Sequence, residues 1–431
     1  MHDRSRKAVW HPCTQMKQHE TLPLITISRG EGAWLYGVDG KRYLDAIGSW
    51  WVNLFGHGNS RINAALFDQL DKLEHVMLAG FTHEPVVKLS ERLTDLTGSN
   101  LGHCFYSSDG ASAIETALKM SFHYWRNSGH PEKNHFISLQ NGYHGETLGA
   151  LSVTDVGLFK DTYMPLLRPS TQVPTPDWRY ALEGETARDH ALRAAAALET
   201  HVATRHGETA ALIVEPLVQG AAGMGMYHPD YLKLAREICT RYGIHLIADE
   251  IAVGFGRTGT LFACEQADIW PDFLCLGKGL SAGYLPLSVV MTTEKVYHAF
   301  YGDETTLAFL HSHTHAGNAL ACRAALATLD IFEQDEIITA NRFKAKYLNE
   351  AVVPIACHAK TKNFRNCGMI WAFEVETEDS AFPRKFFQAA LEQELSLRPL
   401  GNTVYFMPPY IINQQEMDLL VAGTLRVLES C

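Results

Sequence analysis

The period of apolar positions changes at about residue 61, and this change predicts the fold. Beyond it, short apolar runs of the kind found in buried strands alternate with stretches in which apolar residues recur every three or four positions. The expected strands are 103–106, 135–139, 211–214, 244–248, 273–276 and 287–291. The expected helices include 114–125 and 229–243, each with one apolar face. Strands that alternate with helices predict a mostly parallel sheet covered on both faces, which is an α/β fold.

The two ends of the chain follow other patterns. Residues 1–60 are rich in glycine and aromatic residues and favour short strands at 26–28 and 33–36. From Asn318 a long alanine-rich helix leads into a second series of elements. That series consists of strand 369–375, helix 383–394, strand 403–407 and a closing helix from about residue 415. We therefore expect a large domain of residues 61–317, a smaller α+β domain of residues 318–431, and an N-terminal segment, 1–60, that joins the small domain. The proline-rich stretch 156–185 has little periodicity and is interpreted as an ordered surface excursion.

Composition narrows the class of protein. A chain of 431 residues with 46% hydrophobic and 20% charged residues is typical of a soluble globular protein. The net charge of −11 argues against binding to nucleic acid or to anionic membranes, because both need a basic surface. Nine cysteines without a Cys-x-x-Cys motif predict buried free thiols in a reducing compartment. With no apolar run of membrane-spanning length, we expect a cytoplasmic enzyme.

Lys278 follows the apolar run Phe273–Leu276 and Gly277. Such a strand would place the lysine at the carboxyl end of the sheet, where open α/β folds bind ligands. A solvated surface charge is the ordinary role of a lysine, and a Schiff base with pyridoxal phosphate (PLP) is the specific alternative. Asp249 ends another expected strand and could either cap the next segment or stabilise the protonated ring nitrogen of PLP. Together the two residues favour PLP.

Two further segments could complete such a site. Asp109, Gly110 and Ala111 lie between a strand and a helix, where open backbone N–H groups would bind a phosphate. An ordinary N-cap explains the same residues equally well. Tyr143 lies in Asn141-Gly-Tyr-His-Gly and could stack on a planar ring or simply be buried.

Three other patterns point to other chemistry. Gly254-Phe-Gly-Arg-Thr-Gly satisfies the dinucleotide pattern G-x-G-x-x-G, but no clear helix follows it, so NAD binding is disfavoured. His311-Ser-His-Thr-His315 could bind a metal, although a polar loop near a ligand is favoured. Arg398 could be a solvated strand end or could bind a substrate carboxylate through its planar guanidinium. Of the adjacent Trp50 and Trp51, we expect one in the core and the other free to line a pocket.

The chain resembles the class III, fold type I PLP-dependent aminotransferases. The resemblance rests mainly on Leu246-Ile-Ala-Asp-Glu-Ile-Ala-Val-Gly-Phe-Gly-Arg-Thr-Gly and Pro271-Asp-Phe-Leu-Cys-Leu-Gly-Lys-Gly-Leu. Within this family, the motifs Trp10-His-Pro, Gly48-Ser-Trp-Trp, Glu215-Pro-Leu-Val-Gln-Gly-Ala and Met407-Pro-Pro-Tyr-Ile-Ile are similar to those of one branch. That branch converts 8-amino-7-oxononanoate to 7,8-diaminononanoate in biotin synthesis, usually with S-adenosylmethionine as amino donor and in some members with lysine.

The resemblance implies a PLP site shared between the subunits of a homodimer. Lys278 would bind PLP covalently and move the proton, and the implied PLP contacts besides it are Gly110, Ala111, Tyr143, Asp249, His313 and Thr314, the last two from the other subunit. The implied substrate contacts are Cys13, Trp50, Tyr143, Lys278, Ser312 and Arg398. The family often has tyrosine where Cys13 stands, and often Ser or Thr where Ala111 stands. The alternatives are a class III transaminase for an ω-amino acid or diamine, a nicotinamide oxidoreductase, and a catalytically silent PLP-binding protein.

Overall fold

A seven-stranded sheet forms the centre of the computed structural model, which describes residues 1–22 and 24–430. Its strand order is β4-β12-β11-β10-β7-β5-β6. The strands are β4 (His103–Ser107), β5 (His135–Leu139), β6 (Thr171–Val173), β7 (Thr209–Val214), β10 (His245–Asp249), β11 (Phe273–Leu276) and β12 (Ser288–Thr292). Only β12 runs against its neighbours in this sheet, so the predicted mostly parallel α/β sheet is confirmed.

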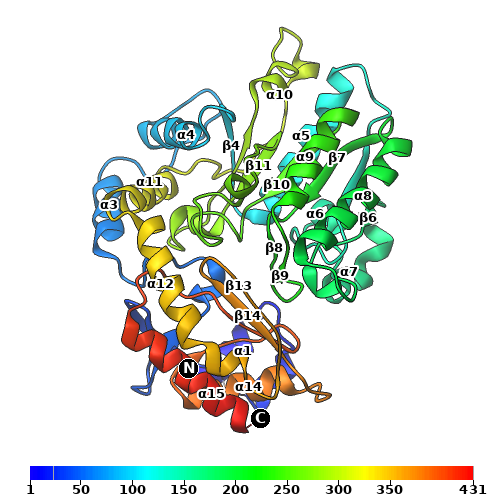
Figure 1. Cartoon of the computed structure of the whole chain (residues 1–431). Helices are drawn as coiled ribbons and strands as arrows, with labels where there is room; N and C mark the ends of the chain where they lie inside the picture. Colours follow the sequence, from blue (N-terminus) through cyan, green and yellow to red (C-terminus); the bar gives the residue numbers. More distant parts are fainter. Residues whose placement is uncertain (23, 431) are drawn as a thin grey trace.

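Both faces of this sheet are buried, which explains why its strands are continuous apolar runs. In β11, Phe273 and Cys275 pack in one hydrophobic cluster with α5 (Gly110–Asn127), whereas Leu274 and Leu276 belong to the core on the other face. Successive side chains of a strand point to opposite faces, so a strand between two layers needs apolar residues at every position. Several helices surround the sheet in Figure 1: α3 (Ser60–Leu70), α4 (Glu84–Leu96), α8 (Ala187–Arg205), α9 (Asp230–Tyr242) and α11 (Ala319–Gln334).

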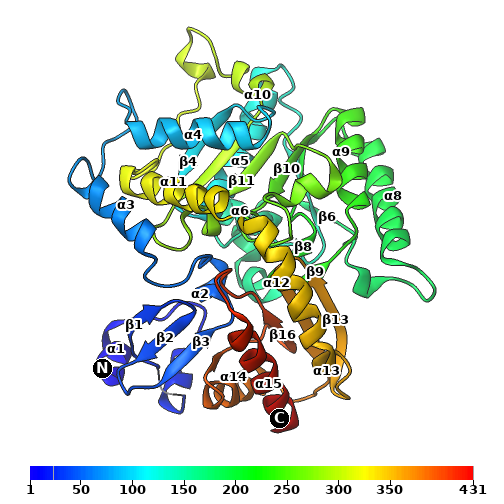
Figure 2. The same ribbon diagram turned by 60° about the vertical axis from the view of Figure 1, so that its left-hand side comes forward.

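Two smaller sheets lie beside the central one (Figure 2). The first contains β1 (Ile27–Glu31), β2 (Trp34–Gly37), β3 (Arg42–Asp45) and β15 (Leu395–Ser396). The second contains β13 (Thr361–Cys367), β14 (Ile370–Val375) and β16 (Thr403–Phe406). With them lie α12 (Ile337–Ala351), α14 (Phe382–Glu392) and α15 (Gln414–Ser430). Strand β3 pairs in parallel with β15, so the beginning of the chain shares a sheet with its last third. The domain boundaries at residues 60 and 317 stay a prediction.

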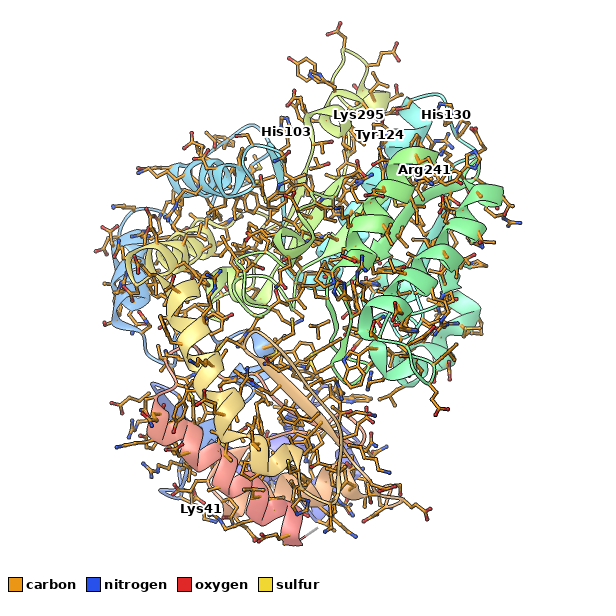
Figure 3. All side chains as sticks on the ribbon, viewed as in Figure 1. Lys41, His103, Tyr124, His130, Arg241 and Lys295 are labelled. Carbon is orange, nitrogen blue, oxygen red and sulfur yellow. The ribbon has the colours of Figure 1, made fainter. Side chains whose placement is uncertain are left out.

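The remaining α-helices and strands are short. They are α1 (His2–Ala8), α2 (Gly48–Trp51), α6 (Leu148–Val153), α7 (Gly157–Lys160), α10 (Glu294–His298), α13 (Val353–Ala356), β8 (Val218–Gln219) and β9 (Gly225–Met226). Figure 3 shows that side chains fill both parts of the molecule, with Lys41 at the end opposite to His103 and Lys295. Among the described residues, no helix is long and apolar enough to cross a bilayer.

Two predictions need correction. The stretch 156–185 is not only a surface excursion, because Thr171–Val173 forms the edge strand β6 beside β5. The cysteines are not all buried, because Cys13 and Cys357 are exposed; all eight described cysteines are free, and Cys431 lies outside the described residues.

Candidate active site

Lys278 and Asp249 meet at one edge of the central sheet, as their positions in the sequence predict. Strands β10 and β11 run in parallel with Asp249 opposite Cys275, so both chains leave the sheet at the same edge. Gly277 follows β11 in extended backbone, and Lys278 then turns into the left-handed region, with φ of 39°. Backbone strain of this kind clusters at functional sites.

Lys278 and Asp249 line a cavity of about 510 Å³. The structure brings seven of the predicted site residues to its wall: Cys13, Trp50, Gly110, Ala111, Tyr143, Asp249 and Lys278. The other lining residues are Trp51, His144, Gly145, Glu146, Thr147, Glu215, Ile251 and Ala252. Segments far apart in the chain thus converge on one cavity.

The surroundings of Lys278 favour its neutral amine. Burial lowers the pKa of the Lys278 ammonium, and the carboxylates of Asp249 and Glu215 oppose part of this shift. Its Nζ lies 5.0 Å from the centre of the Trp51 ring. Only a neutral amine can attack an aldehyde carbon, so a buried lysine with a lowered pKa is suited to Schiff-base formation.

Asp249 is held in place as a buried carboxylate. Its Oδ2 lies 2.8 Å from Nδ1 of His144, and its Oδ1 accepts a hydrogen bond from the backbone N–H of Ile251. Nε2 of the same histidine is buried and has no partner in the described part of the chain. A fixed carboxylate facing the cavity is what a protonated pyridine nitrogen needs as its partner.

The beginning of α5 offers an anion site at the same wall. Asp109 caps the helix by accepting from the backbone N–H of Ser112. The N–H groups of Gly110 and Ala111 occupy the first two helical positions, where no intrahelical acceptor exists. A Cβ on Gly110 would lie 2.9 Å from Cγ2 of Ile251, so any larger residue here would have to displace that side chain. The N-cap by Asp109 therefore leaves the predicted phosphate site open, and with Lys278 this arrangement fits PLP.

Tyr143 is fixed from two sides by carboxylates that sequence reasoning did not assign. Its backbone N–H donates to Oε2 of Glu215 at 2.8 Å, and its hydroxyl donates to Glu146 at 2.9 Å. Burial, with Glu146 nearby, raises the pKa of the Tyr143 phenol, so the hydroxyl stays protonated. Glu215 directly follows β7, the strand beside β10, and β10 ends at Asp249. The sequence could therefore have placed Glu215 at the same edge of the sheet as Asp249. His144 was also missed, although it lies within the same glycine-flanked motif.

The carboxyl group of Glu215 should make stability depend on pH. Burial raises its pKa from 4.5 to about 7, with Asp249 adding to the shift and His144 opposing it. Because the folded protein retains a proton that the unfolded chain releases, this contribution is present below pH 4.5 and is lost as pH rises through about 7. In Glu215→Gln we expect a smaller fall in Tm over this range, measured by calorimetry. Some fall remains, because the pKa of Glu250 is also raised to about 7; a slope equal to wild type contradicts the assignment to Glu215.

Four predicted residues do not line the Lys278 cavity of their own chain. Arg398 lies beside it: its guanidinium carbon is 5.2 Å from the centre of the Trp50 ring, and its Nη2 donates to the carbonyl of Cys13 at 3.0 Å. Arg398 and Cys13 also line an adjoining cavity of about 680 Å³. Ser312, His313 and Thr314 are on an irregular segment after Leu310 and reach neither cavity.

The dinucleotide pattern has a structural role instead. Arg257, at its centre, is buried and donates to the carbonyl oxygens of Met407, Pro408, Trp51 and Asn53. A guanidinium committed to backbone carbonyls ties this loop to the segments around Trp51 and Met407, and the next helix along the chain is the five-residue 3-10 helix Ala263–Ala267. For the His311–His315 run, no group of three or more metal-ligand side chains occurs within residues 1–22 and 24–430.

Comparison with known proteins identifies the family. Residues 15–428 match the model of the aminotransferase class-III family. The chain is 46% identical to an adenosylmethionine-8-amino-7-oxononanoate aminotransferase of Helicobacter pylori, over 98% of this chain and 96% of that one. The crystal structure of the enzyme of the same name from Methanocaldococcus jannaschii matches with a TM-score of 0.94 and 33% identity, over 100% and 98% of the two chains. An amine transaminase from an uncultivated Pseudomonas species, in a PLP-bound form, matches with a TM-score of 0.93 and 32% identity, over 98% and 99%.

These matches confirm the predicted fold class and the predicted cofactor, and they contradict the NAD alternative. They span almost the whole chain, and the family model includes every residue that lines the Lys278 cavity except Cys13. The chain belongs to the class-III aminotransferases, which are PLP-dependent enzymes.

Proposed function

We propose that this enzyme transfers an amino group to 8-amino-7-oxononanoate, giving 7,8-diaminononanoate for biotin synthesis, with S-adenosylmethionine as donor. The observation that carries the proposal is the joining of the Lys278–Asp249 cavity to Arg398 across Trp50. The keto substrate is apolar in its middle and anionic at one end, so it needs an apolar wall and one distant cation. The names of the relatives from H. pylori and M. jannaschii support the same substrates.

Each residue around the cavity has a separate role in the proposed reaction. When bound, PLP supplies an electron sink that stabilises negative charge at the substrate carbon. Nζ of Lys278 would take the proton from that carbon and return it two atoms away, on the other side of the nitrogen, which is a 1,3-shift. Asp249 would keep the ring nitrogen protonated, the N–H groups of Gly110 and Ala111 would bind the phosphate, and Tyr143, on the cavity wall, would lie beside the ring.

Trp50 and Arg398 would select the substrate. The guanidinium packs over the indole, so the arginine is pre-oriented and loses little freedom when a carboxylate binds. Cys13 lines the cavity where the family often has tyrosine, and its backbone carbonyl holds Arg398. The cysteine thus supports the arginine through its backbone and needs no phenol to do so.

Replacement of Arg398 should affect the ketone far more than the cofactor. In Arg398→Ala, we expect KM for 8-amino-7-oxononanoate to rise roughly 10–100-fold, because a charge-assisted hydrogen bond is lost. PLP affinity, measured by absorbance titration, should be unchanged. Arg384→Ala is the matched control, since both arginines line the adjoining cavity and it is Arg398 whose guanidinium packs on the Trp50 ring. An unchanged KM in Arg398→Ala removes this residue from the substrate site.

A half-reaction screen tests the function itself. Loss of the PLP absorbance is followed after addition of S-adenosylmethionine, lysine, simple ω-amines or diamines to the purified holoenzyme. We expect S-adenosylmethionine to bleach the cofactor and 8-amino-7-oxononanoate to restore it. Bleaching only by ω-amines or diamines favours the second candidate, which the similarity to an amine transaminase supports. A spectrum that no donor changes indicates a silent PLP-binding protein.

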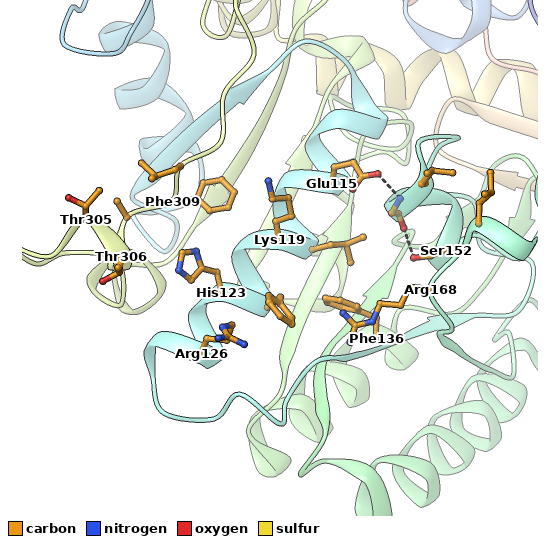
Figure 4. A pocket seen from close by; sticks show the side chains of 17 residues that line it. Glu115, Lys119, His123, Arg126, Phe136, Ser152, Arg168, Thr305, Thr306 and Phe309 are labelled. Carbon is orange, nitrogen blue, oxygen red and sulfur yellow. Dashed lines mark hydrogen bonds between the residues drawn. The ribbon is translucent and has the colours of Figure 1, made fainter. Parts of the chain in front are cut away.

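We further propose that two copies share their active sites. Segment 308–310 leads to Ser312, His313 and Thr314 and lines a cavity of about 690 Å³ on the outer side of α5 (Figure 4). Leu148, Leu166 and Leu310 line it while 52%, 65% and 76% exposed, which is unusual for large apolar side chains outside an interface. A second copy over this face would bury them, and the following segment could then reach the partner's phosphate site.

Mixed variants test this arrangement. Thr314→Ala should weaken PLP binding about tenfold, because one phosphate hydrogen bond is lost. Subunits of Thr314→Ala and Lys278→Ala, mixed and re-associated, should form hybrid dimers in which one site is intact. That site should bind PLP with wild-type affinity and be active. If the mixture is no better than its two parents, the sites are not shared; a monomer in sedimentation analysis excludes the dimer.

A further inference from the structure

The segment that carries both cavity-lining tryptophans has an unusual backbone. Gly48, Ser49, Trp50 and Trp51 have φ values of 56°, 44°, 71° and 73°, so four successive residues are left-handed. Only glycine adopts this conformation without strain, and a left-handed run that includes serine and two tryptophans persists only where its surroundings enforce it. Something nearby must therefore hold this turn.

Asp45 bonds directly to this turn, to which Arg257 also donates, at the carbonyl of Trp51. Asp45 ends β3, is 1% exposed, and accepts three hydrogen bonds through its carboxylate. Oδ1 accepts from the backbone N–H of Ser49 at 2.8 Å, and Oδ2 accepts from the Ser49 hydroxyl at 2.7 Å. Nε2 of His57 lies 3.1 Å from Oδ2. Bonds to an ionised acceptor are the strong ones, and two of these three fix the first non-glycine residue of the turn.

The turn in its left-handed form sets the positions of both indoles. Trp51 is 5% exposed, donates through Nε1 to the Tyr405 hydroxyl at 3.1 Å, and lies against Lys278. Trp50 is 45% exposed and lies under Arg398. Because β3 and β15 are parallel, with Asp45 opposite Ser396, the carboxyl ends of both strands deliver the turn and Arg398 to one place.

We propose that Asp45 is a positioning residue for the substrate cavity: its carboxylate stabilises the left-handed turn that holds Trp50 under Arg398 and Trp51 against Lys278. Asp45 itself does not line the cavity. It acts on the ketone through the two tryptophans and the arginine. The predicted change in KM rests on the proposed function, whereas the role of Asp45 in holding the turn does not.

The test compares Asp45→Ala and Asp45→Asn in the holoenzyme. In Asp45→Ala, KM for 8-amino-7-oxononanoate should rise about tenfold or more while the bound PLP content is unchanged. Asp45→Asn should have a smaller effect, because one carbonyl oxygen still accepts from Ser49. Asp272→Ala is the matched control: Asp272 also accepts from a backbone N–H, that of Leu246, and from Arg236, but at the opposite end of β10. An unchanged KM in Asp45→Ala, or an equal rise in Asp272→Ala, overturns the proposal.

A second measurement does not depend on turnover. Acrylamide quenches tryptophan fluorescence in proportion to exposure. Each protein is measured with and without the additional change Trp50→Phe, and the difference between the two gives the quenching of Trp50. Asp45→Ala should change this quenching, and Asp272→Ala should not; identical values in Asp45→Ala and wild type contradict the positioning role. If wild type does not use the ketone but the quenching changes as expected, the proposed substrate is wrong and the role of Asp45 stands.

Strain at Ser49 gives a third comparison. Glycine adopts φ near 44° freely, whereas β-branched valine does not, so Ser49→Gly should keep a KM near wild type and Ser49→Val should resemble Asp45→Ala. Both variants lose the hydroxyl and keep the backbone N–H, so the comparison isolates the turn. Equal KM values for the two variants contradict a role for the left-handed conformation.

Discussion

Lys278→Ala should lose transamination by on the order of 10⁴-fold, the largest effect expected for any single side chain. Its amine is the only lysine nitrogen on the wall of the cavity, among the described residues, and burial lowers its pKa toward the neutral form. The variant removes both the Schiff-base partner and the group that moves the proton. No neighbour can replace it, because Asp249 is bonded to His144 and Glu215 to two backbone N–H groups.

Covalent attachment of the cofactor distinguishes this loss from misfolding. Wild type reduced with borohydride should retain PLP on Lys278, identified by mass spectrometry of the peptide. Lys278→Ala and Lys278→Arg should both bind PLP without fixing it, and Lys278→Arg preserves the positive charge and most of the volume. Lys233→Ala, on the exposed face of α9, should behave as wild type. A cofactor that is still fixed covalently in Lys278→Ala would show that another amine is the partner.

The central strands were predictable because the physical constraint on them is local. A strand between two layers needs apolar residues throughout, and β10 and β11 have them. Strand β6 was missed because it has only three residues, Thr171–Val173, on the sheet edge, where no continuous apolar run is required. The reversed direction of β12 was also beyond prediction, since strand polarity depends on the path of the connection and leaves no mark in an apolar run.

The site residues that could be predicted are those whose location follows from their place directly after a strand. Lys278 and Asp249 each follow a strand, and parallel strands bring their ends together. The bond between His144 and Asp249 joins residues 105 positions apart, so no spacing rule could reveal it. The left-handed turn at Ser49–Trp51 contradicts the preferences of its own residues, and its backbone is held by side chains from other segments, among them Asp45 and Arg257.

Trp50 and Trp51 show how far the sequence pattern predicts the site. Adjacent side chains cannot share one face of a regular element, so one indole was expected in the core and the other at a pocket. The structure has Trp51 at 5% and Trp50 at 45% exposure, which agrees. Yet both line the cavity, so the buried indole also contributes to the pocket wall. A residue in the core can therefore be a site residue, which the alternation of core and surface positions does not reveal.

Asp249 should rank second to Lys278 in its effect on turnover. In Asp249→Asn, the ring nitrogen of PLP would lose the negative charge that keeps it protonated, and the amide can still bond to Nδ1 of His144, so the pocket keeps its shape. We therefore expect kcat to fall about 10²–10³-fold, the range for removal of one electrostatic stabiliser, with borohydride fixation on Lys278 intact.

A cofactor with a permanent charge tests the stated reason for that loss. Asp249→Ala leaves space at the ring nitrogen, and N-methylated PLP carries a positive charge there that needs no carboxylate to maintain it. If Asp249 acts by keeping the nitrogen charged, N-methylated PLP should restore activity in Asp249→Ala and inhibit wild type, where the methyl group meets a buried carboxylate. If it restores nothing while PLP itself binds normally, Asp249 acts instead by orienting His144, and His144→Ala should then reproduce the full loss.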